Sequence, residues 1–235
     1  MPKHAPSPDF TGFSADGLQF MRDLAANNTR EWFEARKTAY IDTVQTPAVA
    51  LVASLGARLQ DLVPDVTVDT RTNGSGNLMR LHRDTRFSTD KSPYKTHIPM
   101  MFPVGGKKMD SPGFGLQITL DGVDCMAGVF GFDKGALARY RDAVVSDTHG
   151  PALVKAVATV RKAGPYTLNG GSFKRVPSGY DPEHPRAEWL RYGGLYASIS
   201  GLPQDIARSA ALVDVLMTHF AAMKPIVDWL RAAIG

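Results

Sequence analysis

The chain has 235 residues, 43% of them hydrophobic and 21% charged, so it can bury a core and is not a wholly disordered protein. No run approaches the roughly 18 consecutive apolar residues that a membrane-spanning helix needs. Residues 1–9 also lack the apolar segment of a secretory signal. A single Cys excludes an intramolecular disulfide. These features predict a cytoplasmic protein that has no membrane partner.

The excess positive charge is concentrated in one segment. The formal net charge is +4, from 27 Lys and Arg against 23 Asp and Glu. The segment from Arg80 to Lys108 holds seven basic and two acidic residues, which leaves 20 basic and 21 acidic residues elsewhere. A local basic cluster raises the concentration of anions nearby, so phosphate, carboxylate, nucleic acid and acidic partners are the candidate ligand classes. A solvated charged loop is the structural alternative.

The first third of the chain has helical patterns. Ser14 is expected to cap a helix that runs to about residue 26. Asn28 with Glu31 three residues later resembles a capping box, which predicts a second helix. A third helix is expected to restart at Pro47, because proline suits the first helical position, and to end at Pro64.

From residue 77 the pattern changes to the alternation of strands. Residues 78–83 and 97–102 are candidate strands. Pro99 limits the second strand to a sheet edge or a strand end, because proline has no N–H to donate to a neighbouring strand.

The clearest local prediction is a hairpin from residue 114 to 130. Asp121-Gly122 is a connection typical of two-residue turns, which places Leu120 opposite Val123. One face of the hairpin is then wholly apolar. On the other face Gly115 would meet Gly128, and this predicts that a ligand or a helix closely approaches the backbone there.

Helical patterns return in the second half of the chain and continue to its C-terminal end. They are expected at 134–146, 151–162 and 186–192, with a strand at 195–200 and two helices within 204–234 divided near Pro225. We therefore predict an α+β fold with a central, mainly antiparallel sheet covered by helices from the N- and C-terminal parts. Residues 9–235 would form a single domain after a flexible lead at 1–8, with a helical C-terminal extension at 203–235.

The common motifs of cofactor binding and hydrolysis are absent. The sequence has no Gly-x-Gly-x-x-Gly between a strand and a helix, no phosphate loop and no Gly-x-Ser-x-Gly. Cys125 is expected to be a buried thiol on the apolar hairpin face. His82, Asp84 and His97 could supply metal ligands, but the arginines around them disfavour a divalent cation. The sequence thus indicates no cofactor and no metal.

The run from Arg80 to His97 contains the candidate site. Guanidinium groups donate bidentate hydrogen bonds to oxyanions, and ammonium groups add mobile point charges. The candidate ligand-binding residues are Arg80, Arg83, Arg86, Lys91 and Lys95. Asp84 and Asp90 could orient the arginines or act as bases, and Tyr94 could donate a hydrogen bond, so these three are the catalytic candidates. The alternative is an internal salt-bridge network that pins a long loop to the sheet, and both interpretations remain open.

At this run the sequence resembles the domain of unknown function 2461 family. Residues 83–95 match its Arg-Asp-Thr-Arg-Phe-Ser-x-Asp-Lys-x-Pro-Tyr-Lys stretch at every specified position, and residues 174–180 resemble a later motif. The resemblance spans about residues 10–200 and implies a family without an established activity. The later motif adds Lys174 and Arg175 to the ligand-binding candidates, together with Arg186, if the fold brings them beside Arg83 and Arg86.

Three functional hypotheses follow, and the sequence does not decide whether the protein is an enzyme. The first is a pocket for a small anionic ligand. The second is nucleic-acid binding, motivated by a pI near 9.2 and by Phe87, Tyr94 and Phe102 among the basic residues. The third is a non-catalytic interaction module in which the central run is structural.

Overall fold

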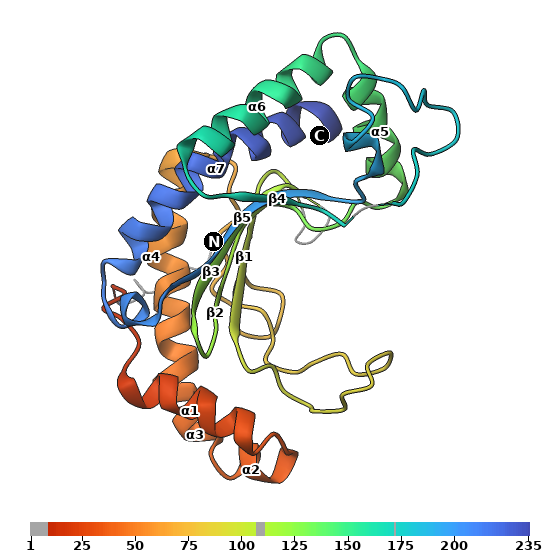
Figure 1. Cartoon of the computed structure of the whole chain (residues 1–235). Coiled ribbons are helices and arrows are strands. Elements are labelled where there is room, and N and C mark those ends of the chain that lie inside the picture. Colours follow the sequence, from red (N-terminus) through yellow and green to blue (C-terminus); the bar gives the residue numbers. More distant parts are fainter. Residues whose placement is uncertain (1–8, 107–110, 172) are drawn as a thin grey trace. The chain divides into compact units, whose positions relative to one another are not determined.

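The protein is described by a computed structural model that covers residues 9–106, 111–171 and 173–235. Its elements are drawn in Figure 1. The lead expected at 1–8 and the basic residues Lys107 and Lys108 lie outside the described residues.

The predicted α+β fold with a central antiparallel sheet is confirmed. The strand order is β1-β2-β3-β5-β4, and β1 forms one edge, as Pro99 predicts. The strands are β1 (Ile98–Pro103), β2 (Gly113–Ile118), β3 (Gly122–Val129), β4 (Thr167–Asn169) and β5 (Leu195–Pro203). The strand expected at 78–83 is replaced by two isolated bridges, Leu78 with Met100 and His82 with Tyr94.

The described helices lie before β1, between β3 and β4, and after β5. They are α1 (Ala15–Ala26), α2 (Arg30–Glu34), α3 (Lys37–Tyr40), α4 (Thr46–Leu62), α5 (Lys134–Val145), α6 (His149–Ala163) and α7 (Leu212–Ile234), with a π-helical turn at Ile41–Gln45 and 3-10 turns at Trp189–Arg191 and Gln204–Arg208. Ser14 caps α1 as expected, because its side chain accepts a hydrogen bond from Gly17 N. Within the described residues, none of these helices has the length and apolar character needed to cross a membrane.

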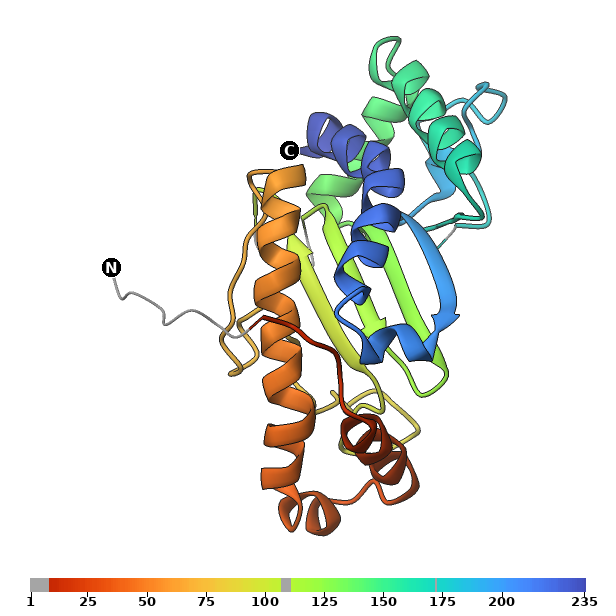
Figure 2. The same cartoon turned by 90° about the vertical axis from the view of Figure 1, so that its left-hand side faces the viewer.

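The chain divides into two compact units. The first comprises the described residues within Met1–Phe102, Gly115–Asp124 and Ser200–Met217. In this unit α4 runs beside β1 (Figures 1 and 2) and buries Leu51, Leu55 and Leu59 completely. Phe10 N donates to Ser54 Oγ at 3.1 Å, which ties the segment before α1 to α4.

The second unit comprises Pro103–Phe114, Cys125–Ile199 and Thr218–Gly235. Its helices α6 and α7 are joined by a partly buried hydrogen bond, in which Trp229 Nε1 donates to His149 O at 2.8 Å. The prediction that the C-terminal helix divides near Pro225 is wrong, since α7 continues through it. Phe220, Ile226 and Leu230 are fully buried, and this packing offsets the hydrogen bond that proline cannot donate.

The hairpin forms where expected, but with another turn. Thr119 N donates to Gly122 O at 2.8 Å, so the loop residues are Leu120 and Asp121 instead of Asp121 and Gly122. No described non-glycine residue has a positive φ, which a type I′ turn would require at both loop positions. The register therefore shifts by two residues. Because side chains alternate with a period of two, the shift leaves the same residues on the apolar face.

The close approach to the hairpin backbone comes from a strand, and neither a ligand nor a helix causes it. A Cβ atom at Gly128 would lie 2.2 Å from the carbonyl oxygen of Leu195 and 2.6 Å from the Cα atom of Tyr196, both in β5. The φ of Gly128 is +139°, a conformation that side chains rarely adopt. This glycine therefore permits the pairing of β3 with β5.

Candidate functional site

The candidate site lies in the first unit, on the long connection between α4 and β1. The connection is anchored by Asn77, which is 2% exposed. Its Nδ2 donates to Met101 O at 2.6 Å and to Thr67 O at 3.0 Å. These bonds hold both ends of the connection, so the basic run between residues 80 and 97 projects from a fixed base.

Asn28 connects the helical start of the chain to this run. Tyr94 N donates to Asn28 Oδ1 and Asn28 Nδ2 donates to Tyr94 O, both at 3.0 Å. The side-chain amide thus pairs with the Tyr94 backbone as a neighbouring strand would. The expected capping box is wrong, because Thr29 caps α2 by accepting from Trp32 N at 3.3 Å. The amide of Asn28 is therefore left for a contact that no local pattern indicates.

Two arginines of the run are paired with its two carboxylates. Arg83 forms an ion pair with Asp90 and donates to Ser92 O at 3.3 Å and to Ser88 Oγ at 3.4 Å. Arg86 Nε donates to Asp84 Oδ1 at 3.0 Å, and Arg86 Nη2 donates to Asp84 Oδ2 at 2.7 Å. Both guanidinium heads are therefore committed to internal contacts.

The two lysines of the run bind backbone carbonyl groups, and neither forms an ion pair with a carboxylate of the described residues. Lys91 Nζ donates to Thr85 O at 3.0 Å. Lys95 Nζ donates to Arg80 O and, at 3.3 Å, to His82 O. Partial burial and the charge of Arg80 lower the pKa of Lys95. An ammonium group has three N–H donors, so each lysine keeps hydrogen-bonding capacity for a ligand.

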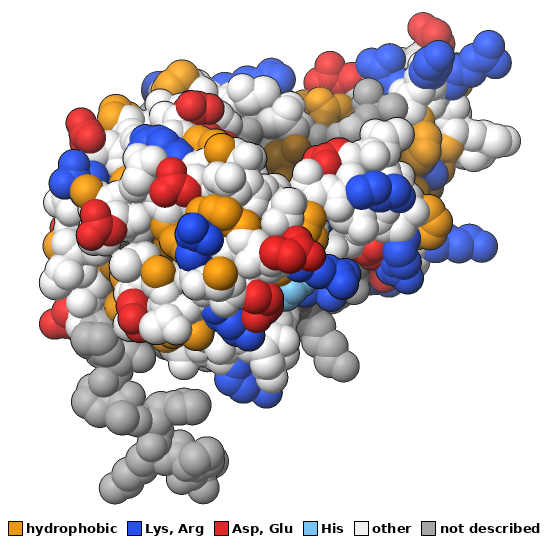
Figure 3. Space-filling view, turned by 90° about the horizontal axis from the view of Figure 1, so that it is seen from below, with side chains coloured by type: hydrophobic (Ala, Val, Ile, Leu, Met, Phe, Trp, Pro, Cys, Tyr) orange, Lys and Arg blue, Asp and Glu red, His pale blue; other side chains and the backbone are white. Residues whose placement is uncertain are grey.

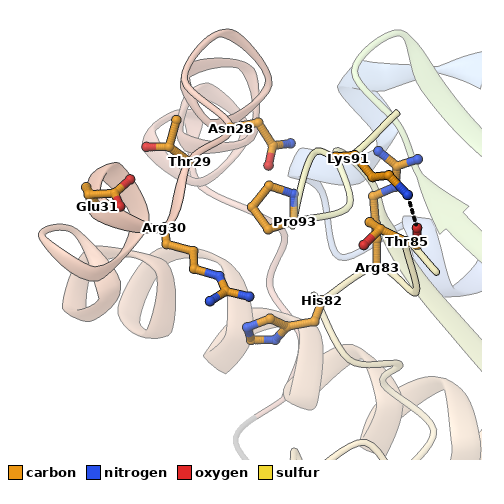
Figure 4. A pocket seen from close by; sticks show the side chains of 9 residues that line it. All are labelled: Asn28, Thr29, Arg30, Glu31, His82, Arg83, Thr85, Lys91 and Pro93. Carbon is orange, nitrogen blue, oxygen red and sulfur yellow. Dashed lines mark hydrogen bonds between the residues drawn. The ribbon is translucent and has the colours of Figure 1, made fainter. Parts of the chain in front are cut away.

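A hollow of about 360 Å³ lies between the start of α2 and this run. We call it the α2 hollow; its lining residues are Asn28, Thr29, Arg30, Glu31, His82, Arg83, Thr85, Lys91 and Pro93. In Figure 4, Arg30 points from α2 toward His82, while Arg83 and Lys91 lie on the opposite wall and Glu31 lies far from Lys91. Three permanent cations thus face the hollow against one carboxylate. Arg30 makes no ion pair within the described parts of the chain.

A second hollow of about 570 Å³ shares Asn28 and Arg83 with the first. We call it the β1 hollow; it is lined by Ala25, Asn28, Arg83, Asp84, Asp90, Ser92, Tyr94, Lys95, Thr96 and His97. It contains both paired carboxylates, so its charges are more balanced than those of the α2 hollow. Among the residues that the structure describes, no three His, Cys, Asp or Glu side chains are grouped as a metal site would need.

The two carboxyl groups of the run, Asp84 and Asp90, are held in their charged form at neutral pH. Hydrogen bonds from the side chain and the backbone N–H of Arg86 lower the pKa of Asp84 to about 2. Hydrogen bonds from Ser92 and from Arg83 also lower the pKa of Asp90. A carboxylate with so low a pKa is a weak base at neutral pH, so these two are better suited to orient arginines than to accept a proton.

Two other groups near the β1 hollow have shifted pKa values. Burial, with the charges of Lys95 and Arg83, lowers the pKa of His97, and Asp124 opposes this shift. Burial raises the pKa of Tyr94, so its hydroxyl group keeps its proton at neutral pH. The ring of Tyr94 lies between Phe33 and His82, with ring-centroid distances of 4.4 Å and 5.0 Å.

The structure distributes the sequence-predicted site residues over several places. Arg83 and Lys91 line the α2 hollow, whereas Asp84, Asp90, Tyr94 and Lys95 line the β1 hollow together with Arg83. Arg80 and Arg86 line neither. Lys174 and Arg175 belong to the second unit. Arg186, also in that unit, donates to Val144 O at 2.6 Å and to two further carbonyl groups at the end of α5.

Arg30 lines the α2 hollow but is not among the residues that the sequence predicts for the site. It lies outside the basic run and next to an apparent helix cap, so its position beside His82 depends on the contact of Asn28 with Tyr94, 66 residues away. The sequence indicates His82 only as a candidate metal ligand.

The surface over α1 to α3 is mixed in charge. Figure 3 looks at the end where these helices lie, and Lys and Arg side chains alternate there with Asp and Glu side chains. This surface differs from the continuous positive stripe that typifies proteins that follow a nucleic-acid backbone.

The fold and the site together define an α+β protein with a cation-lined hollow between the start of α2 and the connection from α4 to β1. The chain belongs to the DUF2461 family of conserved hypothetical proteins, whose family model matches residues 16–229. The match includes most of α7, so it continues beyond the residue 200 at which the motif resemblance ends. No curated protein and no solved structure matches the chain.

Proposed function

We propose that the protein binds a small anion, a phosphate or carboxylate group, in the α2 hollow. The observation that carries the proposal is the position of Arg30, an exposed guanidinium without an acidic partner in the described chain, opposite Lys91 across the hollow. The volume of about 360 Å³ lies within the range of small-molecule sites, roughly 300–1,000 Å³.

Each lining residue has a distinct role in this proposal. Arg30 offers a planar pair of donors to an oxyanion, and Lys91 offers the N–H groups that Thr85 O does not use. His82 adds a ring nitrogen at the edge of the hollow. Arg83 supports the wall, because its guanidinium head holds Asp90, Ser88 and the backbone of Ser92.

The experiment is a calorimetric titration of the full chain with inorganic phosphate at low salt. Arg30→Ala and Lys91→Ala should each weaken binding by about 10- to 150-fold, which corresponds to roughly 1.5–3 kcal/mol for a charged hydrogen bond. Arg36→Ala is the matched control, because Arg36 is an exposed arginine of the same region that packs over Trp32 and lies outside the hollow. Equal affinity of wild type and Arg30→Ala, or no binding at all, would contradict the proposal.

The non-catalytic module with a structural ion-pair network is the second candidate. It is favoured by the three contacts that the guanidinium group of Arg83 makes within its own loop. Under this hypothesis Arg83→Ala lowers the melting temperature, while phosphate leaves the melting temperature of the wild type unchanged.

Nucleic-acid binding receives less support. Of the three aromatic residues that motivate this hypothesis, Tyr94 is 2% exposed and Phe102 is fully buried, so neither can stack on a base. The expectation of affinity that falls steeply with salt can be tested with the same protein and a short single strand.

A further inference from the structure

Phe87 is a large hydrophobic side chain that is exposed to solvent instead of being buried in the core. It is 95% exposed, far more than the other exposed large hydrophobic side chains described. Among the described residues, its ring contacts the Arg86 guanidinium, whose carbon lies 5.8 Å from the ring centroid. A phenylalanine in this position contributes nothing to the core, and its ring face is open to a molecule in solution.

The loop that carries Phe87 is closed on itself. Lys91 Nζ and Ser88 N both donate to Thr85 O, at 3.0 Å and 3.3 Å, and the ion pair of Arg83 with Asp90 joins the two sides of the loop. Phe87 therefore projects from a backbone that is already ordered. An ordered support lowers the entropic cost of using an exposed side chain as a contact.

Phe87 also lies close to the α2 hollow. Thr85 lines the hollow, and Phe87 follows it by two residues, so their Cα atoms are at most about 7 Å apart. A nucleotide separates its phosphate from its base by one sugar ring. The loop that carries Phe87 is therefore within reach of a base joined through one sugar to a phosphate in the α2 hollow.

Resting on the proposed function, we propose that the anion is a nucleotide. Its phosphate group would bind to Arg30, Lys91 and His82, and its base would stack on Phe87. A mononucleotide fits better than a strand, because Tyr94 and Phe102 are buried and Phe87 is the one aromatic side chain that the run exposes.

The test compares adenosine 5′-monophosphate with ribose 5-phosphate by calorimetry on the full chain. Both carry the same phosphate and sugar, so any difference in affinity reports the base. We expect the nucleotide to bind about 5- to 150-fold more tightly, the range for one base stacked on an aromatic side chain. Phe87→Ala should remove this advantage and leave the affinity for ribose 5-phosphate unchanged, whereas Phe87→Trp should preserve it.

Phe173→Ala is the matched control, because Phe173 is 48% exposed and lies in the other unit. It should leave both affinities unchanged. Equal affinity of the two ligands for the wild type overturns the nucleotide assignment but leaves anion binding standing. Binding of neither ligand overturns both proposals. A short single-stranded oligonucleotide that binds much more tightly than the mononucleotide, with steep salt dependence, would overturn the assignment to a mononucleotide.

Discussion

The contact of Asn28 with Tyr94 gives the sharpest test of how the site is built. Asn28→Ala removes two hydrogen bonds of 3.0 Å and leaves the N–H and C=O of Tyr94 without their partner. Each bond contributes a net 0.5–1.5 kcal/mol, and Tyr94 is buried, so we expect the free energy of unfolding to fall by about 2 kcal/mol. For a chain of this length that lowers the melting temperature by roughly 4–8 °C.

Asn27→Ala is the matched control for this substitution. The neighbouring Asn27 donates a single exposed bond, from its Nδ2 to Asp23 O at 2.9 Å, so its loss should cost less than about 1 kcal/mol. Urea denaturation and calorimetry measure both changes. Because Asn28 lines both hollows, its truncation should also weaken phosphate binding. Equal stability of the two variants would refute the conclusion that Asn28 holds the site together.

Three further predictions concern the loop, the β1 hollow and the sheet. Arg83→Ala should lower the free energy of unfolding by about 1 kcal/mol, because the contacts that are lost are partly screened by solvent. Urea denaturation measures this change, and an unchanged denaturation midpoint would contradict the conclusion that Arg83 stabilises the loop. The lowered pKa of His97 favours its neutral form in the folded protein, so stability should decrease as the pH falls below about 6.5. In thermal melts between pH 5 and 8, His97→Gln should reduce this dependence of the melting temperature on pH. Gly128→Ala would place a Cβ atom 2.2 Å from Leu195 O on a residue with a positive φ, so it should lower the free energy of unfolding by at least about 1–3 kcal/mol. A variant with the same melting temperature as the wild type would disprove the close pairing of β3 with β5.

The free energy of unfolding at low pH should depend on the protonation of the carboxylates in the loop. Asp84 has a pKa lowered from 3.8 to about 2 in the fold, so its stabilising contribution is complete above about pH 4 and is lost as the pH falls toward 2. Asp84→Asn should remove that part of the acid dependence. NMR titration of the carboxyl carbon measures the pKa directly, and a value near 3.8 would contradict the contact with Arg86.

The elements that local sequence determines were predicted well. The cap at Ser14 and the edge position of β1 depend on one residue and its neighbours, and both are confirmed. The apolar face of the hairpin was also correct, since a register shift of two leaves the side-chain alternation intact. The turn itself was wrong, because Thr119 accepts hydrogen bonds from Asp121 N and Gly122 N and so ends the strand two residues earlier.

The features that sequence reasoning missed depend on contacts distant in the chain. Pro225 was expected to divide a helix, but the buried side chains around it maintain α7. Asn28 was expected to cap a helix and instead binds Tyr94. The basic run was recognised as the candidate site from its residue types. Its division into two hollows, and the addition of Arg30, follow from tertiary packing that no local pattern contains.

The span of 66 residues between Asn28 and Tyr94 also has a consequence for the order of folding. Closing a loop of that length costs roughly 4 kcal/mol of chain entropy, which the local helices cannot recover by themselves. During synthesis the wall formed by α2 emerges long before the segment that completes the hollow. The α2 hollow is therefore expected to form late in folding, since a chain that stops before Tyr94 holds the residues of α1 to α4 but lacks the contact that joins Asn28 to the run.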